Sequence, residues 1–146
     1  MRRTLTFIAP RQVEIREEPL PPLGADDVLV QTVCSAISAG SELLIYRGQF
    51  PRELADSHDS LSSGLKYPLA YGYACVGRVI EAGPHVDPEW VGRFVFSFQP
   101  HTTHFIARPE ALFPVPEGLA PEAACFLPNM ETAVNFLLDG APLIGE

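Results

Sequence analysis

Proline and glycine recur at short intervals along the whole chain, and they constrain its fold more than any other feature. Fifteen prolines among 146 residues are about twice the usual share. Proline lacks a backbone N–H donor and ends helices, while glycine favours turns. A chain divided in this way can form short strands joined by ordered turns but few long helices. We therefore expect a mainly β fold.

The apolar segments between these turns have the pattern of β-strands. Apolar and polar side chains alternate over residues 12–16, which predicts a strand with one face buried. Residues 74–82 form the strongest strand pattern, and it ends at Gly83. Further strands are predicted at residues 28–33, 93–98, 104–107 and 112–115.

Predicted helices gather at the C-terminal end of the chain. One covers residues 121–126, and a second follows Asn129 as its N-cap, with Glu131 in its first turn and Gly140 at its end. Upstream, residues 43–46 can form one short helical turn that Gly48 closes. Residues 49–66 hold few apolar side chains and are predicted to be a long surface loop.

Charge and composition exclude several classes of partner. The formal net charge is −8 and the ten basic residues are scattered, so no clustered basic surface for nucleic acid is expected. No apolar run approaches the ~18 residues of a membrane span, and the N-terminus lacks an apolar signal stretch. The three cysteines are widely spaced and form no CxxC pair, which favours reduced, buried thiols. A cytoplasmic protein is expected.

No catalytic constellation is complete in the sequence alone. His101 and His104 lie three positions apart, but no carboxylate or thiolate residue lies near them in the sequence. We therefore expect two ordinary polar surface residues and not a pair of metal ligands. The phosphate-binding pattern GxGxxG is absent from the printed chain. Residue types and spacing therefore establish only a β-rich domain.

The order of several short segments carries more information. These segments are residues 28–30, 37–42, 45–48, 67–74, 77–83, 91–96, 116–119 and 131–133. In this order and with these separations the segments resemble the GroES-like N-terminal domain of the medium-chain dehydrogenase/reductase superfamily, over nearly the whole chain. The segment ISAGSE at residues 37–42 and the pair Gly72-Tyr73 resemble the branch that contains the bacteriochlorophyllide dehydrogenase of pigment synthesis. The resemblance implies a partly open β-barrel with a few short helices.

The same resemblance implies an enzyme that transfers hydride between NAD or NADP and an alcohol, a carbonyl compound or an activated alkene. Residues 1–146 would form its substrate-side domain. The nucleotide-binding Rossmann domain would follow, since the glycine-rich turn expected shortly after Glu146 is not in this chain. The implied partners are a small-molecule substrate and that Rossmann domain, and a homodimer stays open for the complete protein.

The chain departs from the zinc-using members of this superfamily at both ligand positions. Ala39 stands where those enzymes carry a cysteine ligand, and Tyr73 stands at the histidine of their Gly-His-Glu segment. A methyl group cannot bind zinc, and neutral tyrosine is a poor ligand beside cysteine or histidine. The lobe with four close cysteines that holds structural zinc is also missing between Phe96 and Ala107. No zinc of either kind is predicted.

Without a metal, hydrogen-bond donors must polarise the substrate oxygen. The resemblance makes Ser41, at the family's hydroxyl position, and Tyr73, near the vacant metal position, the catalytic candidates, with Glu42 at the acidic position. The plainer interpretations are a turn or cap serine, a cavity-filling tyrosine and a glutamate that braces its loop. Thr132 is a candidate for contact with the cofactor.

Two further hypotheses remain open. In one, the chain has kept its barrel as a non-catalytic binding or assembly module after losing the metal site, since fold does not determine function. Alternatively, it belongs to a zinc dehydrogenase with unusual ligands such as Cys34, His58 or His101.

We expect the purified protein to contain no stoichiometric zinc, because Ala39 and Tyr73 occupy the two positions where ligands are needed. Elemental analysis after purification without metal-affinity resin measures this. Zinc at a level of one ion per chain that survives mild chelation would contradict the prediction and support the unusual-ligand hypothesis.

Overall fold

The computed structural model describes residues 1–50 and 66–140 of the chain. With 34% strand and 25% helix, it confirms the predicted mainly β fold, whose longest helix lies at the C-terminal end. The strands are β1 (Arg2–Ala9), β2 (Gln12–Glu18), β3 (Val28–Ser35), β4 (Cys75–Ala82), β5 (Phe94–Ser97), β6 (His104–Ala107) and β7 (Phe113–Pro114). The helices are α1 (Ser41–Arg47), α3 (Pro121–Ala124) and α4 (Leu127–Gly140), with short 3-10 turns at Pro88–Trp90 and Pro109–Ala111.

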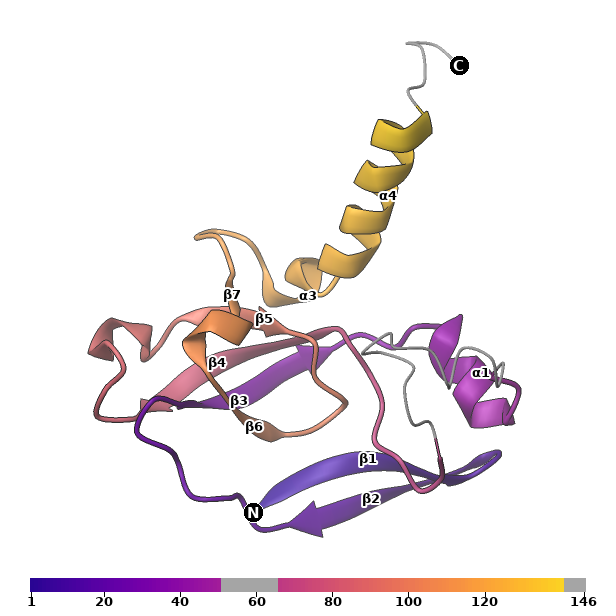
Figure 1. Ribbon diagram of the computed structural model, residues 1–146, viewed down its shortest axis with the longest axis horizontal. Helices are drawn as coiled ribbons and strands as arrows, with labels where there is room; N and C mark the ends of the chain where they lie inside the picture. The colour runs from indigo at the N-terminus through magenta and orange to yellow at the C-terminus, as the bar shows by residue number, and fades with distance from the viewer. Residues whose placement is uncertain (51–65, 141–146) are drawn as a thin grey trace.

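The strands form two antiparallel sheets that face each other. One is the β1–β2 hairpin, and the other has five strands in the order β6-β3-β4-β5-β7. Figure 1 shows the hairpin below the larger sheet. Isolated bridges connect β1 of the hairpin to segments outside the strands, from Thr4 to Thr102 and from Phe7 to Leu69. Over the described residues the sheets do not close into a barrel, as expected of a partly open one.

Strand β4 lies at the centre of the larger sheet, between β3 and β5. Its residue Gly77 lets β3 approach closely, because a Cβ there would lie 2.5 Å from Val30 Cγ1 and 2.7 Å from the Gln31 carbonyl oxygen. Val79, at 1% exposure, donates its N–H to the Arg93 carbonyl over 3.0 Å. The strand that the sequence predicted most strongly is therefore the structural centre of the domain.

Both faces of this sheet are buried, each against a different partner. Neighbouring residues of a strand point to opposite faces. One apolar cluster consists of Val28, Val30, Cys75, Val79, Val95, Phe105 and Leu112. The other contains Ala74, Val76 and Phe96 together with Ala124 and Cys125 at the end of α3. Helix α3 thus covers the face opposite the first cluster.

The hairpin differs from its prediction in two ways. Strand β1 was not predicted, because its buried residues Thr4 and Thr6 are polar and give no apolar alternation. Strand β2 is present, but Val13 and Ile15 are 47% and 60% exposed, so the predicted buried face is wrong. The apolar side chains of β2 point away from the main core.

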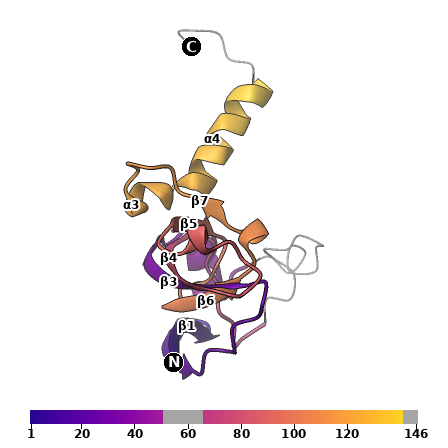
Figure 2. The ribbon, with the colours of Figure 1, turned by 90° about the vertical axis from the view of Figure 1, so that its left-hand side faces the viewer.

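Helix α4 extends away from the sheets, as Figure 2 shows. It begins at Leu127, so the predicted N-cap role of Asn129 is wrong. Proline is tolerated in the first turn of a helix, where its missing N–H has no partner to lose, and Pro128 therefore does not delay the start. Gly48 ends α1 in the left-handed conformation as predicted, whereas most of the predicted loop at residues 49–66 lies outside the described residues.

We expect Val79→Pro to lower the free energy of unfolding by at least about 3 kcal/mol, through the lost hydrogen bond to Arg93 and a steric clash within the central strand. The control Val79→Ala keeps the N–H and should cost about 2 kcal/mol for its two buried methyl groups. Equilibrium denaturation in urea measures both. Weak amide protection of residues 75–82 against hydrogen exchange would contradict the central position of β4.

Candidate functional site

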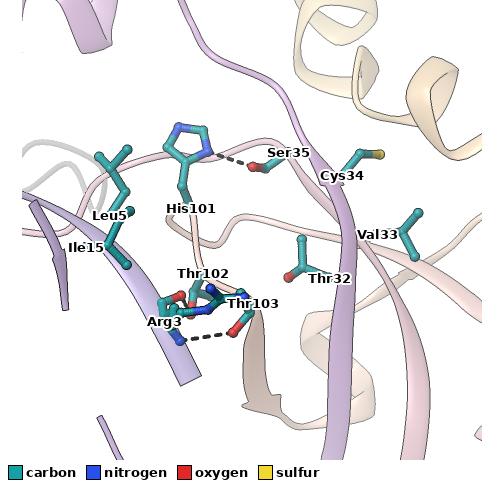
Figure 3. A pocket seen from close by; sticks show the side chains of 10 residues that line it. All are labelled: Arg3, Leu5, Ile15, Thr32, Val33, Cys34, Ser35, His101, Thr102 and Thr103. Atoms are coloured by element: carbon teal, nitrogen blue, oxygen red, sulfur yellow. Dashed lines mark hydrogen bonds between the residues drawn. The ribbon is translucent and has the colours of Figure 1, made fainter. Parts of the chain in front are cut away.

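A pocket of about 490 Å³ lies between the hairpin, strand β3 and the connection from β5 to β6. Figure 3 shows its lining residues as sticks. Leu5 and Ile15 of the hairpin and Val33 of β3 supply apolar walls, and Ser35 and His101 supply polar groups. Its volume is within the range of small-molecule sites, about 300–1,000 Å³.

A continuous chain of hydrogen bonds runs from this pocket into the protein. The Ser35 hydroxyl lies 2.7 Å from His101 Nδ1, and His101 Nε2 lies 2.8 Å from Glu42 Oε2. The side chains of His101 and Glu42 are only 12% and 5% exposed. Burying a carboxyl group is costly unless it is hydrogen-bonded, so this arrangement requires both partners.

Three separate segments supply these groups. Ser35 is the last residue of β3, Glu42 lies in the first turn of α1, and His101 lies between β5 and β6. The second carboxyl oxygen of Glu42 accepts a 2.8 Å hydrogen bond from the Ser38 N–H, which fixes the loop between β3 and α1. The His101 carbonyl accepts the Leu5 N–H over 2.9 Å, which holds the histidine segment against the hairpin.

Gly72 shapes the space beside the imidazole. Its φ of +144° is a conformation that other residues rarely adopt. A Cβ at this position would lie 3.2 Å from both His101 N and His101 Nε2. The glycine therefore lets the residue 67–74 segment approach the histidine closely.

Two protonation states of His101 satisfy both of its contacts: the imidazolium, which donates to Glu42 and to the Ser35 oxygen, and one neutral tautomer. A neutral imidazole with its proton on Nε2 donates to Glu42, and its Nδ1 lone pair accepts the Ser35 O–H. No buried side-chain nitrogen or oxygen in the described part of the molecule lacks a hydrogen-bond partner. Chemically, the arrangement can hold a proton on the imidazole and exchange it through the serine hydroxyl with a molecule in the pocket.

The site residues predicted from the sequence lie at different positions relative to the Ser35–His101–Glu42 hydrogen bonds. Glu42 takes part in them. Ser41 is the first residue of α1, and its hydroxyl has no hydrogen bond among the described residues, while Gly40 is the N-cap. Tyr73 packs beside the Ala74, Val76 and Phe96 cluster, with its ring centroid 6.3 Å from that of Tyr71. Neither Ser41 nor Tyr73 lines the pocket that contains Ser35.

Two functional candidates, Ser35 and His101, were missed or misjudged from the sequence. The surface interpretation of His101 is wrong, because its side chain is largely buried. Its carboxylate partner Glu42 is 59 positions away along the chain, so no local motif marked the pair. Thr132 lies on the exposed surface of α4, where its hydroxyl donates to the Pro128 carbonyl over 3.0 Å. Its contact with a cofactor stays a prediction.

The described residues do not fit a zinc ion. They contain no cluster of three or more histidine, cysteine or acidic side chains with the geometry to hold a metal. Ala39 is exposed and offers only a methyl group, and His101 already uses both ring nitrogens. His58 lies outside the described residues. The absence of bound zinc remains a prediction for measurement.

The three cysteines are free thiols: Cys75 belongs to the first apolar cluster, Cys125 belongs to the second, and Cys34 packs against the second. Cys34 Sγ lies 3.5 Å from Cys125 Sγ, and Cys75 Sγ lies 3.4 Å from the Thr32 hydroxyl. Burial, together with the hydrogen bond and charge of Cys125 and the charge of Glu122, raises the pKa of Cys34 to about 12. Burial also raises the pKa of Cys75 and of Cys125. These thiols are therefore protonated at neutral pH.

Comparison with known proteins gives relatives for part of the chain. No family model matches it. The chain is 34% identical over 85 residues to the 2-desacetyl-2-hydroxyethyl bacteriochlorophyllide A dehydrogenase of Cereibacter sphaeroides. The aligned part covers 58% of this chain and 24% of that protein. It is 32% identical over 83 residues to a Mycobacterium tuberculosis protein named a probable zinc-binding alcohol dehydrogenase, covering 57% and 18% respectively. The matched part thus spans a quarter or less of each relative.

Solved structures share the fold over nearly the whole chain. An Escherichia coli alcohol dehydrogenase in complex with NADH matches with a TM-score of 0.73 at 20% identity, over 97% of this chain and 46% of that one. A quinone oxidoreductase of Coxiella burnetii matches with a TM-score of 0.72 at 18% identity, over 99% and 47%. At these identities the likeness concerns the fold alone, and this chain spans about half of each.

Among the described residues, no helix is long and apolar enough to cross a membrane.

We expect Cys34 to react with iodoacetamide at pH 8 about 10- to 100-fold more slowly in the folded protein than in denaturant, because the thiolate is the nucleophile and a pKa near 12 leaves little of it. Since the folded thiol keeps its proton more tightly, its contribution to stability is complete below the ordinary thiol pKa and is lost as pH rises toward 12. Mass spectrometry of the labelled peptide measures the rate, and the peptide that contains Cys34 is identified by its loss of labelling in Cys34→Ser. Equal labelling of folded and unfolded protein would contradict the shielded thiol.

Proposed function

We propose that the chain belongs to the medium-chain dehydrogenase/reductase superfamily and forms the substrate-side, GroES-like domain of a zinc-independent oxidoreductase that uses NAD or NADP. The observation that carries this proposal is the buried Glu42–His101–Ser35 chain, which ends in a pocket of small-molecule size. Perturbed or buried polar groups that converge on a pocket are typical of reactive sites. The substrate class is an alcohol, a carbonyl compound or an activated alkene.

The nicotinamide would supply the hydride chemistry, while this domain orients the substrate and stabilises charge on its oxygen. The support for this cofactor is the relatives, which include a bacteriochlorophyllide A dehydrogenase and a solved alcohol dehydrogenase that binds NADH. We propose that a Rossmann domain following residue 146 binds most of the nucleotide. Thr132 on α4 is the one candidate contact from this chain.

Helix α4 supports the proposal of a further domain as partner. Its apolar side chains are exposed: Val134 by 45%, Phe136 by 72%, Leu137 by 61% and Leu138 by 72%. An apolar hollow of about 420 Å³ lies at its base, beside α3. Apolar surface of this extent usually marks a contact with another protein surface. We propose the following Rossmann domain as that partner.

Because the ligand positions hold Ala39 and Tyr73, oxygen polarisation falls to hydrogen-bond donors in this proposal. Ser41 is the candidate by family position, and its hydroxyl, which makes no hydrogen bond among the described residues, is consistent with that role. Tyr73 is the weaker candidate, because its ring packs beside an apolar cluster. Glu42 acts through His101 and through its hold on the Ser38 loop.

The loss of both ligand positions also favours a second candidate, a non-catalytic GroES-like binding module. Nucleotide-dependent turnover by the natural protein that contains this chain separates the two. A module without activity would bind its partner but leave NAD(P) unreduced with every alcohol offered.

We expect Ser41→Ala in that natural protein to lower kcat by about 30- to 1,000-fold, since a donor facing the reacting oxygen contributes about 2–4 kcal/mol at the transition state. The melting temperature should stay nearly unchanged, because the hydroxyl makes no hydrogen bond among the described residues. Steady-state kinetics and a thermal melt on the same variant measure both. Unchanged turnover with a lowered melting temperature would make Ser41 a structural residue.

A further inference from the structure

We propose that His101 is the proton-exchanging group of this site, with Ser35 as its contact to the substrate and Glu42 as its positioning residue. The proposal rests on the function proposed above and adds to it the acid–base group and the place where the substrate oxygen binds. It follows from an arrangement that no local sequence pattern indicated: a serine, a histidine and a glutamate from three segments, joined by hydrogen bonds of 2.7 and 2.8 Å.

The order of the three hydrogen-bonded side chains, from the pocket inward, suits proton transfer. Ser35 and His101 line the pocket, whereas Glu42 lies behind the imidazole, away from it. With the proton of neutral His101 on Nε2, Nδ1 is free to accept the proton of the Ser35 hydroxyl. The imidazolium that results is stabilised by the Glu42 carboxylate, as the acid stabilises histidine in serine-histidine-acid triads, but with the two ring nitrogens exchanged.

The surroundings keep this imidazole in one orientation. The Leu5 N–H holds the His101 carbonyl, and the next residue, Thr102, shares a 3.0 Å hydrogen bond with Thr4. The Gly72 backbone lies against the ring on the side of Nε2. A group that must accept and return a proton benefits from such a fixed position, because its hydrogen bonds need no rearrangement during the reaction.

The pocket indicates the class of substrate. Ser35 and His101 lie at one end of the pocket, and Leu5, Ile15 and Val33 supply apolar side chains (Figure 3). Further polar groups line the rest of the pocket, from Arg3, Thr32, Thr102 and Thr103. This combination fits a secondary alcohol, or the corresponding ketone, whose oxygen contacts Ser35 and whose apolar body lies between the hairpin and β3. The charged or titratable groups that face the same space are Arg3 of β1 and Cys34 of β3.

In alcohol oxidation the substrate O–H proton would pass to Ser35 Oγ as the serine's own proton passes to His101 Nδ1. An oxidised nicotinamide, when bound, would supply the acceptor for the C–H hydride and its electron pair. The carbon–oxygen double bond forms as the C–H and O–H bonds break. His101 then releases its proton to water, and carbonyl reduction follows the same path in reverse.

The first test reads the histidine itself. In the natural protein that contains this chain, labelled with 15N-histidine, nitrogen NMR should show His101 protonated on Nε2 and unprotonated on Nδ1. The variant His101→Gln assigns the signal. Ser35→Ala should shift the Nδ1 resonance and leave Nε2 nearly unchanged. A neutral His101 with its proton on Nδ1 would overturn the relay, because Ser35 would then face a donor and could not pass its proton on.

The second test reads catalysis, with 1-phenylethanol and 2-heptanol as probes and either NAD+ or NADP+ as oxidant. His101→Gln and Ser35→Ala should each lower kcat by about 100-fold or more and remove the acidic limb of the kcat–pH profile. Glu42→Gln should act in the same direction, since an amide N–H facing Nε2 reverses the tautomer. Ser41→Ala, by contrast, should leave the shape of the kcat–pH profile unchanged, because Ser41 does not line the pocket that holds Ser35 and His101.

His104→Gln is the matched control, because His104 is three residues away and its Nδ1 faces only the Thr103 hydroxyl, at 3.1 Å. Its pH profile should equal that of the unaltered protein. Folding of each variant is checked by circular dichroism, and Ser35→Ala leaves the His101–Glu42 pair intact if His101→Gln does not fold. An unchanged pH profile in a folded Ser35→Ala or His101→Gln variant overturns the proposal. Absence of turnover with both alcohols counts against the proposed function, and the relay is then decided by the NMR result.

Discussion

The buried carboxyl group of Glu42 is the constraint on which the site depends. A carboxyl group with 5% exposure must have hydrogen-bond partners, and here they come from outside its own helix. The Ser38 N–H satisfies one oxygen and His101 the other. These two contacts determine the path of the loop after β3, the start of α1 and the position of the β5–β6 connection. Removing the carboxyl group would release all three at once.

The sheet makes this network possible by bringing distant segments together. Strand β3 pairs with β4 on one side and β6 on the other, so its end at Ser35 lies beside the segment that precedes β6. The hairpin closes the same space from below through its bridges to Thr102 and Leu69. Because both faces of the central sheet are packed with apolar side chains, the polar network lies at its edge. There one member can reach a pocket while another stays buried.

The network also bears on how a domain of this fold can work without the usual metal ligands. A zinc ion would both polarise a substrate oxygen and lower the pKa of its proton. Ala39 and Tyr73 cannot hold such an ion, but a histidine backed by a glutamate can accept the proton, and hydroxyl groups can stabilise the charge. The cysteines do not replace the metal chemistry either, since burial keeps their thiols protonated.

The mainly β fold, the central strand β4, the end of α1 at Gly48 and the helices near the C-terminus could all be predicted from the order of the residues. These features follow from local patterns: alternation along a strand, and proline or glycine at a boundary. Local patterns failed where the inward residues are polar, as at Thr4 and Thr6 of β1, and where Pro128 was tolerated inside the first turn of α4. Only the tertiary structure joined His101 to Glu42 and Ser35, which lie 59 and 66 positions away. The physical reason is that a buried polar side chain bonds to whichever group the packed sheets bring near it. Local sequence patterns do not indicate which distant residue that will be.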